Sequence, residues 1–582
     1  MYDELNEQRR EAVETGSLIR ADFESFTKDP IKEQEKLLLD LLAENKDTEY
    51  GKKYGFEKIT SIRDFQEKLP VTEYKDYEPY IKRMTDHGER NLLTAAPPVW
   101  YNKTSGTAGN PKRIPLTQKS RDLLYRYVLD YQADLFYHEL GENYFGGRSL
   151  NLFRCSDTIQ IMPDGIPFGP LSEGDRRLFY DRLKDKWMHF FAAPPQATFA
   201  GKNTDSRYLY ALYGLRDEHL KCIESTFSSF ILDLSRFIEK NWEELVRDIA
   251  SGTISENVKM PEDIRKVLTE DLDPMPERAA QLRRIFEGGF DRPFMPLVWP
   301  DLMYVSAIAS GGFSRYTREV RSRYLGEKIF FYYRGIVASE GLFSVPVSLA
   351  DCSSCLIPDA LFYEFLPVDD DEEFEGNGGS KNAAPLTMDR LEPGRKYELI
   401  ITNHSGFYRY RMKDVVLVTG THNAVPMVEF QYRADKTVSL TGEKTTEAAL
   451  RFAEEKTAQE CGFLLVDSSV YPDIEEIRYV FVMEIDKVPA NLTEQQILAC
   501  LEKNLAEANP FLGEKSDRGL INDTRLLFAQ PETYNLYKEV MLAKGASAAQ
   551  LKPVTVINNE FEKNFFFSLT DTFEEIKKIS AV

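Results

Sequence analysis

Between about residues 97 and 365 the sequence alternates two kinds of pattern. Short strand-like runs, such as SLNLF and LMYVSAIAS, are separated by segments with the spacing of amphipathic helices, such as FSSFILDLSRFIEKNWEELVRDIA. Strands that alternate with helices pack as a sheet with helices on its faces. This part of the chain is therefore predicted to form an α/β domain.

The flanking segments differ from this pattern. Residues 1 to about 95 have helical spacing, as in IKEQEKLLLDLLAENKDTEYG, where Gly51 is placed like the end of a helix. Beyond an acidic stretch, Asp369 to Pro385, which we interpret as an exposed loop without chemistry, KYELIITNHSGFYRYRMKDVVLVTG predicts two strands joined by a turn. The following segment, YRADKTVSLTGEKTTEAALRFAEEK, changes from strand to helix. A chain of 582 residues exceeds one ordinary domain, and we expect an N-terminal domain over 1–432 and a C-terminal domain over 433–582.

Charge and cysteine content limit the classes of function. The formal charge of -21 argues against binding to nucleic acid or to an anionic membrane, and no apolar run reaches the roughly 20 residues that cross a bilayer. The chain begins without a signal-peptide pattern, and six cysteines in this length do not form a disulfide framework. Cys352 and Cys355 form a CxxC without a second ligand pair, so we treat them as ordinary residues. These features predict a cytoplasmic protein that binds small molecules.

The first chemical motif is TSGTAGNPKRIPLT, which begins at Thr104 directly after the strand-like segment PPVWYNK. Its glycines let the backbone approach a polyphosphate, its hydroxyls can bind phosphate oxygens, and Lys112 supplies a positive charge. The GxxxxGK[ST] spacing of a Walker A loop is absent. The composition predicts a phosphate-binding loop of another kind.

Several further motifs occur in a characteristic order. TSGTAGNPK resembles the phosphate loop of the adenylating superfamily that includes acyl-CoA synthetases and luciferases. It is followed by IVASEGLFSVP, FYEFLPV and GFYRYRMKDVV, and LPVTEYKDYEPYI, YLYALYGLRDEHL, VWPDLMY and GASAAQLKP stand elsewhere in the chain. Together these segments resemble the auxin-responsive acyl-acid-amido synthetase family, from about Thr48 to about Lys563.

The resemblance implies both a fold and an activity. The fold would be α/β, with a large N-terminal adenylating domain of mixed sheets plus a small β-barrel, flanked by helices, and a smaller, mobile α+β lid. The activity would be a ligase reaction: ATP and Mg²⁺ activate a carboxylic acid as its adenylate, and the acyl group then passes to an amino acid. Partners would be these small molecules, without nucleic acid or membrane, and we expect a monomer.

Site residues follow from the motifs that match. By resemblance, the phosphates would be held by Thr104, Ser105, Gly106, Thr107, Gly109 and Lys112. Glu340 would place Mg²⁺ beside Ser339, and Asp414 would accept hydrogen bonds from the ribose hydroxyls. The remaining expected positions are Gly311 and Gly312 for the adenine side, Arg433 for the ribose, and Asp435 and Lys436 for a hinge. Lys112, Glu340 and Lys552 would be the catalytic residues.

The mobile catalytic cation has two candidates, Lys444 in GEKTTE and Lys552 in GASAAQLKP. We favour Lys552, which matches the family's C-terminal lysine. Three departures from the family pattern stand out: Ile336 replaces a usual Tyr, the Arg expected after LKP is missing, and the phosphate loop is one residue shorter. These departures leave the nucleotide contacts and the choice of acceptor open, and they suggest a distant, microbial member.

Other functions remain to be compared. An acyl-CoA ligase would use the same adenylate with a different acceptor, and a nucleotide-binding relative would have lost turnover. A serine hydrolase is disfavoured because GxSxG is absent. His404, in NHSGFYRYR, is interpreted as a satisfied structural histidine. The helix YRYVLDYQADLFYHEL either lines an acyl pocket or belongs to the core, and neither the acid nor the amine can be read from the sequence.

Overall fold

The computed structural model describes most of the chain. The described residues are 2–104, 112–155, 159–199, 204–270, 272–309, 313–368, 384–434, 437–438, 440–441, 443, 445–546 and 551–580. The acidic stretch that we interpreted as an exposed loop lies almost wholly outside them.

The N-terminal segment is helical, as predicted. Its five α-helices are α1 Asp3–Phe26, α2 Pro30–Asn45, α3 Glu49–Tyr54, α4 Ile62–Lys68 and α5 Tyr74–His87. The expectation for Gly51 is wrong, because α2 ends at Asn45 and Gly51 lies inside α3. A Cβ at Gly51 would lie 2.1 Å from the carbonyl oxygen of Asn45, so close packing of the chain, not a helix end, requires glycine here.

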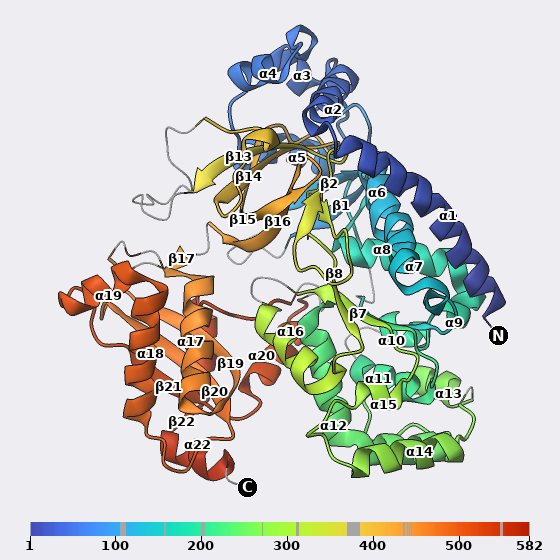
Figure 1. Ribbon diagram of the computed structural model, residues 1–582, viewed down its shortest axis with the longest axis vertical. Coiled ribbons are helices and arrows are strands. Elements are labelled where there is room, and N and C mark those ends of the chain that lie inside the picture. Colours follow the sequence, from blue (N-terminus) through green and yellow to red (C-terminus); the bar gives the residue numbers. More distant parts are fainter. Residues whose placement is uncertain are drawn as a thin grey trace.

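A parallel sheet forms the centre of the N-terminal domain and confirms the predicted α/β pattern. Its strands lie in the order β3 Ser149–Leu152, β6 Cys222–Phe227, β7 Tyr304–Ile308 and β8 Phe330–Tyr333. One face packs in the core of the helices that follow the strands, which are chiefly α11 Ser206–Arg216, α12 Ser228–Ser251, α14 Pro276–Glu287 and α15 Met295–Val298. Figure 1 shows these helices at the lower right of the molecule.

The other face of this sheet packs against α7, one of the helical elements that follow the phosphate-loop segment. These elements are α6 Gln118–Tyr125, the π-helical turn η2 Arg126–Tyr131, α7 Gln132–Leu140 and α8 Leu171–Leu183. The ring of Phe136 stacks on Tyr304 with centroids 4.1 Å apart. Tyr127 and Tyr131 are fully buried in the same core. We interpreted this helix either as the lining of an acyl pocket or as part of the core, and for these two residues the core is observed. Shorter elements of this region are α9 Trp187–Phe190, α10 Pro195–Phe199, α13 Glu262–Glu270, α16 Ser314–Glu319 and η7 Val320–Leu325.

Three further sheets complete the described part of this domain, and one of them is the two-stranded pair of β9 Val337–Ala338 and β10 Gly341–Leu342. A four-stranded sheet has the order β2 Arg113–Thr117, β1 Pro98–Lys103, β5 Pro167–Gly169 and β4 Gln160–Ile161. A six-stranded antiparallel sheet has the order β11 Ser344–Val345, β12 Ser354–Leu356, β16 Val425–Arg433, β15 Tyr410–His422, β14 Lys396–Thr402 and β13 Phe362–Val368. The six-stranded sheet stands where we expected a small β-barrel, but in the described residues its edge strands β11 and β13 do not pair, so the sheet is open. Its β14 and β15 are the two strands predicted from the sequence.

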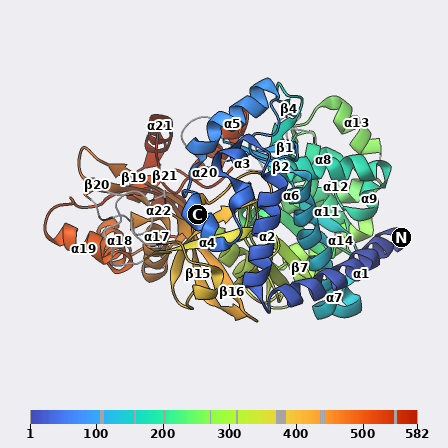
Figure 2. The same cartoon turned by 90° about the horizontal axis from the view of Figure 1, so that it is seen from above.

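The C-terminal domain is α+β and has its own core. Its principal helices are α17 Glu447–Cys461, α18 Glu494–Ala508, α19 Pro510–Asp517, α20 Thr533–Ala543, α21 Glu560–Ser568 and α22 Phe573–Ser580. They pack on a sheet with the order β19 Leu464–Asp473, β20 Arg478–Asp486, β21 Arg525–Ala529 and β22 Thr570–Asp571. Figure 2 shows this domain to one side of the N-terminal domain. Across the described residues, we find no helix that combines the length and apolar character of a membrane span.

Polar contacts join the two domains where α12 and α16 face α20 and β19. Lys538 lies 3.1 Å from the carboxylate of Asp233, and the hydroxyl of Tyr316 donates to Asp467 at 2.9 Å. An exposed pair, Lys240 with Glu532, lies nearby at 3.1 Å. These contacts hold the C-terminal domain in the orientation that the structure shows.

The inner pair gives a testable prediction. Asp233→Asn removes the carboxylate from a lysine that is 24% exposed, so the domain contact is expected to weaken and the radius of gyration in small-angle scattering to rise. Lys240→Ala is the matched control, because its pair is 72% and 59% exposed and such pairs contribute about 0–1 kcal/mol. Equal scattering curves for the two variants would show that the Asp233 pair does not hold the domains together.

Candidate active site

The candidate phosphate loop connects the two strands of an antiparallel pair. Lys103 at the end of β1 pairs with Arg113 at the start of β2, and the backbone N–H of Thr104 donates to the carbonyl of Lys112 at 3.3 Å. Thr104 and Lys112 are thus the two ends of the connection, held next to each other. Ser105, Gly106, Thr107 and Gly109 lie outside the described residues.

Lys112 is held between two tyrosines. Its Nζ donates to the hydroxyl of Tyr410 at 3.3 Å and lies 5.2 Å from the centroid of the Tyr74 ring. The hydroxyl of Tyr74 accepts from the backbone N–H of Arg113 at 2.9 Å, which fixes the ring beside the loop. Both tyrosines stand in the quoted motifs, Tyr74 in LPVTEYKDYEPYI and Tyr410 in GFYRYRMKDVV, but neither was predicted as a site residue. They restrict where the ammonium group can lie.

Glu340 is buried at the turn between two short strands, β9 Val337–Ala338 and β10 Gly341–Leu342. Two asparagine side chains hold the backbone of this turn. The amide of Asn102 donates to the carbonyl of Ser339 at 2.7 Å, and that of Asn403 donates to the carbonyl of Glu340 at 2.8 Å. Ser339 therefore takes part in this arrangement through its backbone carbonyl, which accepts a hydrogen bond from the side chain of Asn102 on β1. Asn102 lies in PPVWYNK and Asn403 in NHSGFYRYR, but neither was predicted as a site residue.

The carboxyl of Glu340 lies in an unfavourable environment for its charge. Burial raises its pKa and the carboxylate of Asp414 raises it further, whereas the charges of Arg433 and Lys112 lower it. These four side chains, from segments far apart in the sequence, therefore act on one another electrostatically. The structure thus places Lys112, Asp414 and Arg433 near enough to Glu340 for their charges to act on it.

Asp414 and Arg433 are partners across β15 and β16. Their register places them opposite each other, and Arg433 Nε lies 3.5 Å from Asp414 Oδ1. Arg433 also donates to the carbonyl of Met412 at 3.2 Å. The carboxylate of Asp414 is therefore oriented by a guanidinium that is itself tied to the strand.

The carboxylates of Glu340 and Asp414 are the groups that could bind a divalent cation at this site. Among the residues that the structure describes, no group of three or more His, Cys, Asp or Glu side chains is arranged to hold a metal. Mg²⁺ usually takes one or two carboxylates together with substrate phosphates and water. Two neighbouring buried carboxylates beside a phosphate-loop lysine fit that pattern, because a cation would offset their mutual repulsion.

Of the other predicted positions, Lys552 lies in the C-terminal domain and the rest lie outside the residues that the structure describes. Gly311, Gly312, Asp435, Lys436 and Lys444 lie outside the described residues. Lys552 is exposed in the C-terminal domain, on a segment that pairs with β19 at Val470. Lys112, Glu340 and Asp414 belong to the N-terminal domain, so Lys552 stands on the other side of the domain junction.

The interpretation of His404 as a satisfied structural histidine is half correct. The side chain is buried, but neither ring nitrogen has a hydrogen-bond partner among the described atoms. Burial lowers the pKa of His404 to about 3, with the charge of Lys119 acting in the same direction. The imidazole is therefore neutral at physiological pH.

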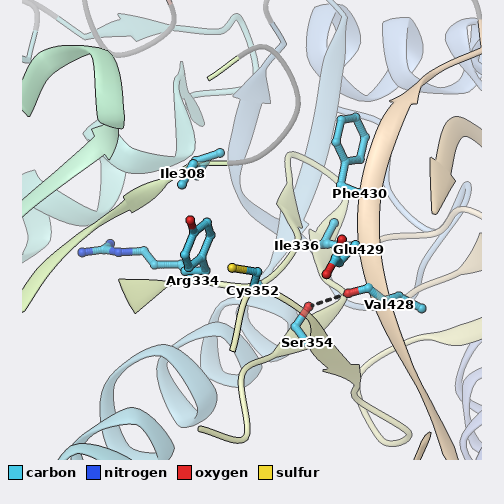
Figure 3. Close-up of a pocket in the computed structure, with 11 residues that line it drawn as sticks. Ile308, Arg334, Ile336, Cys352, Ser354, Val428, Glu429 and Phe430 are labelled. Carbon is cyan, nitrogen blue, oxygen red and sulfur yellow. Dashed lines mark hydrogen bonds between the residues drawn. The ribbon is translucent and has the colours of Figure 1, made fainter. Parts of the chain in front are cut away.

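A small pocket lies between the parallel sheet and the antiparallel sheet (Figure 3). Its volume is about 80 Å³. Ile308 and Ala309 at the end of β7 form one side, and Val428 to Phe430 on β16 form the other. Ile336, at the position where the family usually has Tyr, also lines it, as does the ring of Phe430. The pocket therefore offers an apolar wall beside the segment that leads to Gly311 and Gly312.

Comparisons with known proteins agree with this arrangement. Residues 19–329 match the GH3 family N-terminal domain, 354–433 the GH3 family central domain and 445–560 the GH3 family C-terminal domain. The chain is 29% identical over 567 residues to the indole-3-acetic acid-amido synthetase GH3.8 of Oryza sativa subsp. indica, covering 93% of this chain and 91% of the relative. It is 26% identical over 547 residues to the jasmonoyl-L-amino acid synthetase JAR4 of Nicotiana attenuata, covering 91% and 92%. The solved structure of GH3.15 acyl acid amido synthetase superposes with a TM-score of 0.81 at 21% identity, over 95% of this chain and 96% of that one.

Proposed function

Because the chain belongs to the GH3 family, we propose that it is an ATP-dependent acyl-acid amido synthetase. The carboxylate oxygen of an acid attacks the α-phosphorus of ATP, and the bond from that phosphorus to the pyrophosphate oxygen breaks. The amino group of an amino acid then attacks the acyl carbon, AMP leaves and the nitrogen loses a proton. The observation that carries this proposal is the convergence of Lys112, Glu340, Asp414 and Arg433 at one site.

Each charged side chain of the site would bind a different part of the nucleotide or its metal ion. Lys112 and the loop residues Thr104, Ser105, Gly106, Thr107 and Gly109 would hold the phosphates, where negative charge accumulates as pyrophosphate leaves. Glu340 would hold Mg²⁺, which when bound neutralises phosphate oxygens. Asp414, oriented by Arg433, would accept hydrogen bonds from the ribose hydroxyls.

The pocket of Figure 3 supports a place for the base of the nucleotide. Its edge, at Ala309, leads into Gly311 and Gly312, where glycine allows close backbone contact. The family usually has Tyr at the position of Ile336, and isoleucine has no ring on which the base could stack. The ring of Phe430 offers such a surface instead. Replacement of Tyr by Ile there is thus compatible with nucleotide binding.

The C-terminal domain would act as the lid. β16 ends at Arg433, which pairs with Asp414 in the N-terminal domain, and the first residue of the C-terminal core is Val438. We therefore place the boundary after Arg433, one residue beyond the position expected from the sequence. Asp435 and Lys436 would form the hinge, and Lys552 would be the mobile catalytic cation that the lid carries to the site. We propose that the protein acts as a monomer in the cytoplasm, and the six free cysteines are what a reducing compartment would leave.

Pyrophosphate exchange tests the proposal. Labelled pyrophosphate should enter ATP only when Mg²⁺ and a suitable acid are present, and the productive acid then allows a screen of amino acids by amide formation. Thioester formation with coenzyme A in place of an amine would identify an acyl-CoA ligase instead. Measurable ATP binding without exchange for any acid would identify a nucleotide-binding protein that lacks the reaction.

Lys112→Ala gives a second prediction for the same assay. Loss of an ammonium group from the developing phosphate charge is expected to lower exchange by about a hundredfold. Lys119→Ala is the matched control, because Lys119 pairs with Glu44 at the surface. If both variants exchange at the rate of the wild type, Lys112 does not bind the phosphates.

A further inference from the structure

Tyr410, the first residue of β15, lies among the charged side chains of the candidate site and is only 2% exposed. Its hydroxyl accepts a hydrogen bond from Lys112 Nζ at 3.3 Å. The charges of Glu340, Arg433 and Asp414 all act on its phenol group. One uncharged hydroxyl therefore lies within reach of the field of every charged group that meets at this site.

The ring of Tyr410 is held by strand pairing and by aromatic packing. Its backbone stands opposite Ile401 on β14 and also bridges to Thr72. The rings of Phe407 and Tyr77 pack against it, with centroids 4.8 Å and 6.1 Å away. The fold therefore fixes the position of the hydroxyl before any nucleotide binds.

Lys112 is a side chain that needs such support. Its ammonium group ends a flexible four-carbon stem, and ordering that stem costs conformational entropy. The hydroxyl of Tyr410 and the ring of Tyr74 hold the ammonium in one place. The side chain is then already ordered when negative charge develops on the phosphates, which is the condition for strong electrostatic stabilisation.

The Tyr410 hydroxyl holds the ammonium without cancelling its charge. Burial raises the pKa of the phenol, and Glu340 and Asp414 raise it further while Arg433 lowers it, so the group stays protonated at neutral pH. A bond from an ammonium to a neutral oxygen is weaker than one to a carboxylate. Phosphate oxygens can therefore replace the hydroxyl as the partner of Lys112 when the nucleotide arrives.

Tyr408, two residues earlier in the same motif, provides a structural contrast. It is fully buried, and its hydroxyl donates to the backbone carbonyl of Leu93 at 2.9 Å. Its ring stacks on that of Tyr50 with centroids 5.2 Å apart. The hydroxyl of Tyr408 thus contributes to the packing of the domain, whereas that of Tyr410 contacts the phosphate-binding lysine.

We propose that Tyr410 is a positioning residue, whose hydroxyl holds Lys112 Nζ where the leaving pyrophosphate gathers charge, with Tyr74 as the second support. Tyr410 acts through Lys112 and not on the reacting atoms. Its hydroxyl should therefore have no effect on the reaction when the lysine is absent. This assignment rests on the proposed function, because the phosphate contact of Lys112 belongs to that proposal.

A double-mutant cycle tests the assignment by pyrophosphate exchange. Tyr410→Phe keeps the ring, removes the hydroxyl and is expected to lower kcat/KM for ATP by about tenfold. In the Lys112→Ala background the same substitution is expected to cause no further loss, because residues that act through one another are not additive.

Tyr408→Phe is the matched control, since it also removes a buried hydroxyl from this segment. It should leave exchange unchanged in both backgrounds. A loss from Tyr410→Phe that is equally large with and without Lys112 would overturn the assignment, as would wild-type exchange by Tyr410→Phe.

Two further measurements separate the possible failures. Circular dichroism gives the folded fraction to which each rate is referred, and Tyr74→Leu provides the same cycle for the second support if Tyr410→Phe does not fold. Calorimetric binding of ATP with Mg²⁺ repeats the cycle without turnover. Coupled binding without exchange for any acid would overturn the proposed function and leave the positioning role standing. Exchange by the wild type with additive losses in the cycle would overturn the positioning role alone.

Discussion

Glu340→Gln is expected to lower acid-dependent pyrophosphate exchange by about a thousandfold while leaving the protein as stable as the wild type or more stable. The substitution keeps the shape of the side chain and removes its charge. A neutral amide cannot hold Mg²⁺ against the phosphates. Burial and the neighbouring Asp414 raise the pKa of the Glu340 carboxyl, so the ionised form is the costly one in the folded state.

The pH dependence of the free energy of unfolding shows in which direction the wild type and Glu340→Gln should differ. A carboxyl whose pKa is raised by folding contributes stability below its unfolded pKa and loses it as the pH rises through the folded value. The free energy of unfolding of the wild type should therefore fall relative to that of Glu340→Gln as the pH rises from acidic to neutral. Urea unfolding at several pH values measures this difference.

Glu392→Gln is the control, because Glu392 is an exposed carboxylate on the surface of the same domain. Its exchange rate and stability should equal those of the wild type. Wild-type exchange by Glu340→Gln, with an unchanged requirement for Mg²⁺, would remove Glu340 from the metal site.

Glu364→Ala is expected to destabilise the N-terminal domain by about 3–5 kcal/mol, because it leaves a buried guanidinium without its counter-ion. Arg409 binds Glu364 through two hydrogen bonds, Nε at 3.0 Å and a terminal nitrogen at 2.8 Å. The side chains are only 5% and 1% exposed. Arg409 also donates to the carbonyl of Gln66 at 2.7 Å, which ties the residue just before β15 to α4.

Denaturant unfolding, monitored by a signal from the N-terminal domain, measures this cost. Glu392→Ala is the comparison, since it breaks an exposed pair with Arg395 and should cost less than about 1 kcal/mol. Similar midpoints for the two variants would mean that the buried pair is not a principal source of stability.

Much of the fold could be predicted because it depends on local pattern. The alternation of strand and helix in the middle of the chain produced the parallel sheet, and KYELIITNHSGFYRYRMKDVVLVTG produced β14 and β15. Gly51 was misinterpreted because its constraint is the approach of the Asn45 carbonyl, which no local pattern records.

The candidate site was predicted in its charged members and missed in its supports. Lys112, Glu340 and Asp414 stand in ordered motifs, and the structure brings them together. Tyr74, Asn102 and Asn403 lie within the quoted segments but were not predicted as site residues, yet they fix the lysine and the backbone of the Ser339–Glu340 turn. Side chains of such common types become recognisable only when their partners are known.

By itself, the sequence determined which segments form strands and helices and which chemistry the ordered motifs carry, because hydrophobic period and motif spacing are properties of neighbouring residues. Only the tertiary structure decided that Tyr74 and Tyr410 lie beside Lys112. Each tyrosine is unremarkable in its own segment. Their effect on the lysine depends on separations of a few ångströms between parts of the chain that are far apart in sequence, and those separations are set by how α5, β2 and β15 pack.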